Sequence, residues 1–201
     1  MAGARTCRHQ GVALSGEAPG PERGATAGAI DAESWAFALK LYAEPGIADA
    51  CLALQNECGV DVMMMLMATF AAVRRGIVLT PSDVTAMDAA CRDWREQVVL
   101  PLRALRTMLK SGPAPAPNDQ TEKLRSSIKA AELSAERLQN EALAQWLAKL
   151  PARSRALQRK DIISALRAVI DFALQERQGE PSAAQLSLID AIVDRALGPS
   201  N

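Results

Sequence analysis

Residues 61–76 read DVMMMLMATFAAVRRG, and this stretch decides the fold. Asp61 is a residue type that caps helix N-termini, the two arginines suit the negative end of a helix dipole, and Gly76 ends the run. Between these ends the segment is apolar on nearly every side, and such a helix escapes water only when other helices surround it. We therefore predict that a helix over 62–75 forms the centre of a bundle.

Two shorter helices are expected ahead of this central one. The first begins at the N-cap residue Asp31 and stops at 44–46, because Glu-Pro-Gly breaks a helix. The second covers 47–58 and stops at Gly59. Both carry apolar residues at helical spacing, as the members of a bundle do.

A fourth helix is predicted to begin at 80–83, because Thr-Pro-Ser-Asp supplies an N-cap, a proline at the first helical position and an acid at the third. It runs toward Leu100, where Pro101 either kinks or divides it, and its apolar face continues to Leu109. Its arginines alternate with acidic residues, which is typical of a solvated face with i,i+4 ion pairs. The alternative is that they form a site for an anion or an acidic partner. These arginines are Arg92, Arg95, Arg103 and Arg106.

The longest predicted helix follows a Pro-Ala-rich linker at 111–118. Asp119 and Glu122 are expected to form its capping box, and Pro151 ends it. Its apolar residues alternate at spacings of three and four, so this helix either folds back on the bundle or pairs with another copy of the chain. The candidate interaction residues on it are Leu124, Ile128, Leu138 and Trp146.

The chain as a whole is predicted to be an all-α helical bundle with one long helix after the linker. Residues 1–30 contain six glycines and hardly any large apolar side chain, so we expect a disordered tail there. The bundle domain is placed at 31–150 and a helical C-terminal extension at 151–201. The extension contains two amphipathic helices, over about 159–176 and 182–197, that either dock on the bundle or form an appendage.

Composition narrows the class of partner. The 23 basic and 23 acidic side chains cancel, so no overall field draws the chain to nucleic acid or to an anionic membrane. The longest apolar run, 62–73, is about 12 residues, and roughly 20 are needed to cross a bilayer. Four cysteines without CxxC spacing favour reduced thiols and hence a cytoplasmic location.

Several separated short patterns resemble one known family. They are Trp35-x-Phe37-Ala38, Leu41-Tyr42, Pro45-Gly46-Ile47, Cys51-Leu52-x-Leu54-Gln55, Gly59-x-Asp61-Val62, Trp94-Arg95, Pro101-Leu102-Arg103, Leu105-Arg106 and Ala131-Glu132-Leu133 with Ala135-Glu136. Together they make residues 31–147 similar to an uncharacterised family of short proteobacterial, all-helical proteins, a domain of unknown function. The resemblance implies a bacterial, cytoplasmic, helical protein, and it implies no activity and no site. The methionine run at 63–67 and the segment after Pro151 depart from the family pattern.

No constellation for catalysis or metal binding is evident in the sequence. The single histidine, His9, lies in the expected tail, so the predicted folded part has no imidazole for a nucleophile or a zinc ion. The methionine run could supply soft ligands for Cu(I), but consecutive residues of a helix point in different directions, which favours core packing. We expect no cofactor, no metal site and no catalytic residues.

The function favoured by these patterns is a non-enzymatic protein–protein interaction or adaptor module, acting on an unknown protein partner or by self-association. The alternative is a carrier or enzyme for a small apolar ligand bound between the first four helices. A weaker alternative is nucleic-acid binding through a basic cluster at 153–160, which the zero net charge disfavours. The candidate ligand-binding residues are Trp35, Tyr42, Gln55, Met63 and Trp94.

Overall fold

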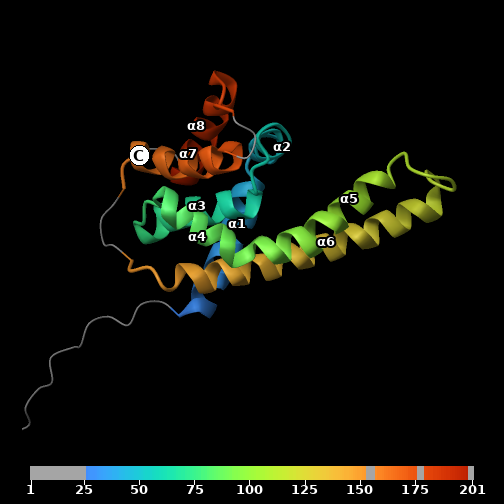
Figure 1. Ribbon diagram of the computed structural model, residues 1–201, viewed down its shortest axis with the longest axis horizontal. Helices are drawn as coiled ribbons and strands as arrows, with labels where there is room; N and C mark the ends of the chain where they lie inside the picture. The colour runs from blue at the N-terminus through green and yellow to red at the C-terminus, as the bar shows by residue number, and fades with distance from the viewer. Residues whose placement is uncertain (1–25, 153–156, 176–178, 199–201) are drawn as a thin grey trace, which may run out of the picture.

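The computed structural model describes residues 26–152, 157–175 and 179–198, and the elements within these ranges are helices joined by turns (Figure 1). This confirms the predicted all-α helical bundle. The elements are α1 (Ala27–Tyr42), α2 (Ile47–Cys58), α3 (Val62–Arg75), α4 (Pro81–Trp94), a π-helical turn η1 (Arg95–Val99), α5 (Leu100–Met108), α6 (Asp119–Leu147), α7 (Arg159–Gln175) and α8 (Ala183–Leu197).

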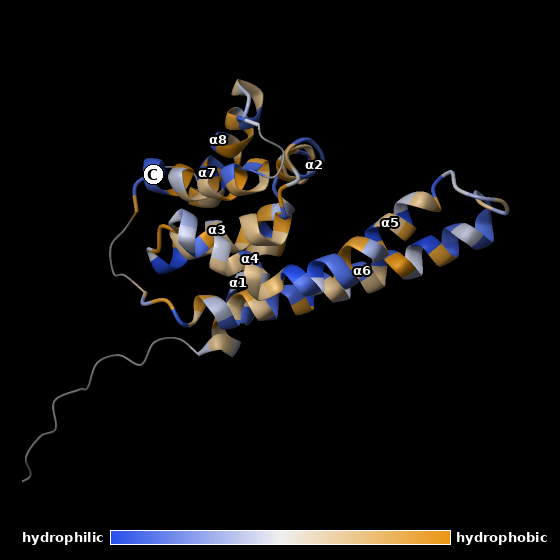
Figure 2. Cartoon of the chain, in the orientation of Figure 1, coloured by the Kyte–Doolittle hydropathy of each residue, from blue (hydrophilic) through white to orange (hydrophobic). Residues whose placement is uncertain are grey.

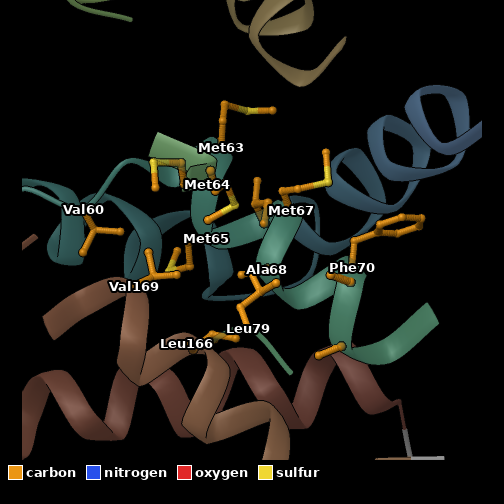
Figure 3. Packing of buried hydrophobic residues seen from close by; sticks show 14 of the residues in the cluster. Val60, Met63, Met64, Met65, Met67, Ala68, Phe70, Leu79, Leu166 and Val169 are labelled. Carbon is orange, nitrogen blue, oxygen red and sulfur yellow. The ribbon is translucent and has the colours of Figure 1, made fainter. Parts of the chain in front are cut away.

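Helix α3 lies at the centre of the bundle, as its all-round apolar surface requires. Helices α1, α6, α7 and α8 all pack against it. Met64, Met65, Met67 and Phe70 are buried in the hydrophobic core. In Figure 3, Met63 points away from the labelled α7 residues of the core.

Helices α7 and α8 dock on the bundle, which answers a question that the sequence left open. Buried residues of α7, among them Leu166 and Ile170, belong to the same core as α3. Helix α8 packs against both α7 and α2. Arg159 at the start of α7 pairs with Asp190 and Asp194 of α8, at 2.8 and 2.7 Å.

Most helix ends carry the caps that the sequence predicts. The Asp61 carboxylate accepts a hydrogen bond from the Met64 amide at 3.1 Å, and the box between Thr80 and Asp83 is present. Two starts differ. Helix α1 begins four residues before Asp31, at a Thr26 cap, because Ile30 is buried in the core and extends the apolar face.

The long helix α6 also begins differently from the prediction. Asn118, and not Asp119, is its N-cap, and the box is completed by Thr121 in place of Glu122. An asparagine side chain caps as well as an aspartate, so the neighbouring residue takes the position. Of the predicted tail at 1–30, residues 1–25 lie outside the described residues.

The α4 helix changes to a π-helical turn just before Pro101. Proline has no N–H, and its ring would press on the carbonyl of the residue four places earlier. Widening the turn at 95–99 relieves that contact, and the Leu100 amide bonds to the Arg95 carbonyl five residues back. The single predicted helix is thus divided, and α5 continues it outward.

Helices α5 and α6 run antiparallel, and their outer parts form a two-helix arm that projects from the body (Figure 1). Hydrophilic and hydrophobic residues are interspersed along α6 (Figure 2), as expected for a helix with one face on the core and another in water. Within the described ranges, no helix combines the length and the apolar character needed to span a bilayer.

The central position of α3 makes a stability prediction. Replacing the fully buried Met65 by Ala should lower the free energy of unfolding by about 2–5 kcal/mol, because the substitution leaves a cavity in the core. The control is Met108→Ala, whose side chain is 48% exposed on α5 and whose loss should cost less than about 0.5 kcal/mol. Urea denaturation of both variants measures the difference, and equal losses would contradict the central placement of α3.

Candidate functional site

A cleft of about 660 Å³ lies at the base of the arm, between α1, α2, α3 and the facing sides of α5 and α6. Its walls are mainly apolar, with Trp35 from α1, Leu66 from α3 and Leu133 from α6 among them. Trp35 is held in place by the Arg137 guanidinium, whose carbon lies 5.3 Å from the ring centroid. The volume is within the range of small-molecule pockets.

The rim of the cleft is unusually apolar for an exposed surface. Its large side chains Leu39, Tyr42, Leu52 and Leu133 are between 36% and 51% exposed. They come from three different helices that converge on one opening. Clusters of large apolar side chains around a concavity mark binding surfaces more often than scattered ones do.

One end of the cleft is polar, and Arg103 organises it. Its Nε donates to Glu132 at 2.8 Å, and its two terminal nitrogens donate to Gln55 and Glu136, each at 2.6 Å. A second arginine, Arg106, also donates to both carboxylate oxygens of Glu132. The guanidinium of Arg103 therefore connects α5 to α2 and to two successive turns of α6.

The pKa values of the two carboxyls in this cluster shift in opposite directions. Burial raises the pKa of Glu136, and the charge of Arg103 offsets this only in part. Burial acts in the same direction on Glu132, but hydrogen bonds from Arg106 and Arg103 outweigh it and lower its pKa. Burial also raises the pKa of Tyr42 at the rim. Glu132 is thus held ionised, and Glu136 is the carboxyl that most readily takes up a proton.

The structure brings together four of the five predicted ligand-binding residues: Trp35, Tyr42, Gln55 and Met63 all line the cleft. The fifth, Trp94, is not among its lining residues. Its indole N–H donates to the Ala135 carbonyl of α6 at 2.9 Å, away from the opening. The Gln55 amide oxygen is already used within the chain, since it accepts from Arg103.

The partners of the cleft arginines were not predicted from the sequence. The predicted i,i+4 pair is present at Arg92, which pairs with Asp88 one turn earlier, but Asp88 is buried and the face is not a solvated one. The i,i+4 pattern fails at Arg103 and Arg106, whose partners are on α6. An alternating charge pattern looks the same in both cases, and only the hairpin between α5 and α6 shows which arginines face inward.

A second buried polar cluster lies beside the cleft and serves the fold. Arg95 donates to Asp88 at 2.6 Å, and the Asp61 cap accepts from Gln139 at 2.6 Å. Glu57, near the end of α2, accepts from Gln185 of α8 at 3.0 Å. The cluster joins the start of α3, the π-helical turn and the middle of α6.

The strip of predicted interaction residues on α6 is divided between two environments. Ile128 and Trp146 are buried within the chain, whereas Leu124 and Leu138 are 52% and 51% exposed. The helix therefore folds back on the bundle with one row of the strip and leaves the other row uncovered by the described residues.

The predicted basic cluster is only partly visible. Arg153 and Arg155 lie outside the described residues. Arg159 is neutralised by two aspartates of α8, and Lys160 is exposed. In the described part of the cluster, the charge of Arg159 is therefore already matched by carboxylates of the same chain.

Neutralising each of the two cleft carboxyls should have a different effect on the free energy of unfolding. At pH 7, Glu132→Gln should lower the free energy of unfolding, on the order of 3 kcal/mol, because two arginines lose their shared charge partner. Glu136→Gln should leave it unchanged or raise it. A carboxyl whose pKa is raised on folding costs stability once the pH exceeds its pKa in the unfolded chain, and Gln removes that cost.

Urea unfolding at pH 7 and pH 5 measures both effects. The difference between wild type and Glu136→Gln should shrink as the pH falls toward 5 and Glu136 is protonated. The stabilisation from Glu132 should persist at pH 5, because a carboxyl whose pKa is lowered on folding loses it only below its pKa in the unfolded chain. Equal destabilisation by both substitutions would contradict this account of the cluster. Glu122→Gln is the control, since its partner Arg125 is on the same exposed turn and little change is expected.

Comparison with known proteins gives a family for the chain. Neither a curated protein nor a solved structure matches it. The sequence model of one family, described as "Protein of unknown function (DUF2390)", matches residues 33–143, which is more than half of the 201 residues. The matched range covers α2 to α5 together with most of α1 and α6, and it includes the residues of the cleft. The chain belongs to the DUF2390 family.

Proposed function

We propose that this protein is a non-enzymatic interaction module whose cleft binds an amphipathic helix of a partner protein. The observation that carries the proposal is the rim, where four large apolar side chains from α1, α2 and α6 surround one open concavity. Grooves that bind helices present apolar sites to residues repeating every three or four positions. An open cleft between helices, with a half-exposed rim, suits a partner that itself remains partly exposed.

The charges of the cleft favour an acidic partner helix. Its lining contains three basic side chains, Arg103, Arg106 and Lys129, against the two acids Glu132 and Glu136. A partner with apolar anchors flanked by Glu or Asp would therefore complement the site.

The polar end of the cleft is already satisfied within the chain. Arg103 donates to three acceptors, and Glu132 accepts from two arginines. A partner that covers these groups does not leave them without hydrogen bonds, so the burial costs little. The cluster is best explained as a rigid wall that shapes the cleft.

Binding of model peptides tests this proposal. Two helical peptides with the same row of leucines, one flanked by Glu and one by Lys, should differ by about tenfold or more in Kd, with the Glu peptide tighter. Leu52→Ser should weaken the Glu peptide by about tenfold, because an apolar contact is lost. Fluorescence anisotropy of labelled peptides provides both Kd values.

The matched control is Leu197→Ser on α8, since Leu52 and Leu197 are both 44% exposed and only Leu52 lines the cleft. The control should bind like wild type. Equal binding of the two peptides, or equal losses for the two serine variants, would show that the cleft does not select an acidic helix.

A second candidate, favoured by the cavity volume and by the four predicted residues in its lining, is a carrier or enzyme for a small apolar ligand. Dodecanoate is a suitable probe because it combines an apolar chain with an acidic head. If it occupies the cleft, it should shift the emission of wild type and of Trp94→Phe, but not that of Trp35→Phe, because only Trp35 lies in the cleft.

If the emission shift depends on Trp94, the carrier or enzyme function is contradicted. The same holds if no variant shows an emission shift and the melting temperature stays unchanged. Peptide binding in the absence of any effect of dodecanoate would favour the first proposal over the second.

The location proposed for the protein is the bacterial cytoplasm. Cys51 and Cys91 are free thiols buried in the bundle. Burial raises the pKa of Cys51 and Cys91 to about 12, which keeps them protonated and unreactive. Unpaired structural thiols of this kind fit a reducing compartment.

A further inference from the structure

The face of α6 that points away from the cleft carries a second uncovered surface, which we call the outer strip. Its members succeed each other at spacings of three, four, three and four, so they share one side of the helix. All five are exposed. They are Leu124, Ser127, Ala131, Ser134 and Leu138.

The outer strip is distinct from the cleft although both are on α6. Leu133 of the cleft rim and Leu138 of the strip are five residues apart, which places them about 140° apart around the helix axis. They are almost equally exposed, at 50% and 51%. A partner on one face therefore leaves the other accessible.

The two serines do not oppose burial of the strip. Ser127 Oγ donates to the Lys123 carbonyl at 3.2 Å, and Ser134 Oγ donates to the Ala130 carbonyl at 3.0 Å. Each hydroxyl is thus satisfied within its own helix, so covering it leaves no hydrogen-bond donor unpaired. The small side chains at the middle of the strip also let another helix approach closely.

The order of residues in the strip identifies the helix that fits it. The strip reads Leu, Ser, Ala, Ser, Leu in either direction, so it is complementary to itself when two copies run antiparallel with a two-fold axis near Ala131. In that arrangement Leu124 of each copy lies beside Leu138 of the other. We propose that the outer strip binds the same strip of a second copy of this chain, as an antiparallel α6 pair.

The charges next to the strip support the same pairing. Lys123 and Glu141 lie 18 residues apart, which is five turns of an α-helix, so they are on one side of it. They are nearly equidistant from Ala131, and both are exposed. An antiparallel partner brings Lys123 of one copy to Glu141 of the other, and does so twice because of the two-fold axis. A parallel pair would place this flank of the two copies on opposite sides of the interface and would form neither ion pair.

Sedimentation equilibrium of the full chain tests the proposal. The expected result is a reversible dimer for wild type. Leu138→Asp should weaken it by about a hundredfold or more, because each dimer loses two apolar contacts. Leu133→Asp on the cleft side should leave the dimer unchanged, and circular dichroism checks that both variants remain folded.

Charge reversal tests the direction of the pair. Lys123→Glu and Glu141→Lys should each weaken the dimer, and the double variant should restore it, because opposite charges then face each other again. Failure of the double variant to recover would overturn the antiparallel arrangement.

Cysteine cross-linking tests the register, in a Cys7→Ser background in which the remaining native thiols are buried. Ala131→Cys should form a reducible disulfide dimer under mild oxidation, since the two copies meet at this position. Leu133→Cys is the matched control and should form much less. A monomer at all concentrations, or equal cross-linking at both positions, would overturn the proposal whatever peptide binding shows for the cleft.

Discussion

The need to surround α3 with other helices is the constraint on which the rest of the structure depends. A helix that is apolar on every side cannot lie at a surface, so α1, α6, α7 and α8 must all contribute a face to it. The C-terminal helices therefore become part of the core and not an appendage. Helix α6, with 29 residues, is longer than the body it covers, and its excess length pairs with α5 as the projecting arm.

Buried polar contacts fix the position of α6 on this core. Glu132 is held by two arginines of α5, Gln139 donates to the Asp61 cap of α3, and Asn140 donates to Asp31 of α1 at 2.8 Å. Sliding α6 by one turn would leave a buried carboxylate and two buried amides without partners, which costs more than any apolar contact it could gain. One register is therefore strongly preferred, and it determines which side chains of α6 face the cleft and which face outward.

Sequence patterns predicted the elements of this fold more completely than their contacts. The helix over Val62–Arg75, its Asp61 cap and its central burial follow from local composition and are confirmed. Trp35, Tyr42, Gln55 and Met63 share the cleft because the first three helices are short and joined by tight turns. Trp94 does not line the cleft, because its indole N–H donates to the Ala135 carbonyl of α6, a partner 41 residues away that no local pattern reveals.

The ion-pair partners of the α5 arginines could not be predicted from the sequence. Arg103 and Glu132 are 29 residues apart and meet only because the chain reverses between α5 and α6. The interaction strip of α6 was predicted as one surface, yet the structure buries Ile128 and exposes Leu138, since a helix with apolar residues on a wide arc can cover a core with only part of it. Only the packed structure shows which apolar residues of α6 stay exposed.

We propose that α6 offers two independent binding surfaces on opposite sides of one helix. Hydroxyl-radical footprinting read at Leu133 and Leu138 tests this most directly, because the two side chains start from almost equal exposure. Raising the protein concentration should protect Leu138 alone, and adding the Glu-flanked peptide should protect Leu133 alone. Protection of both residues by either treatment, or of neither by both, would contradict it.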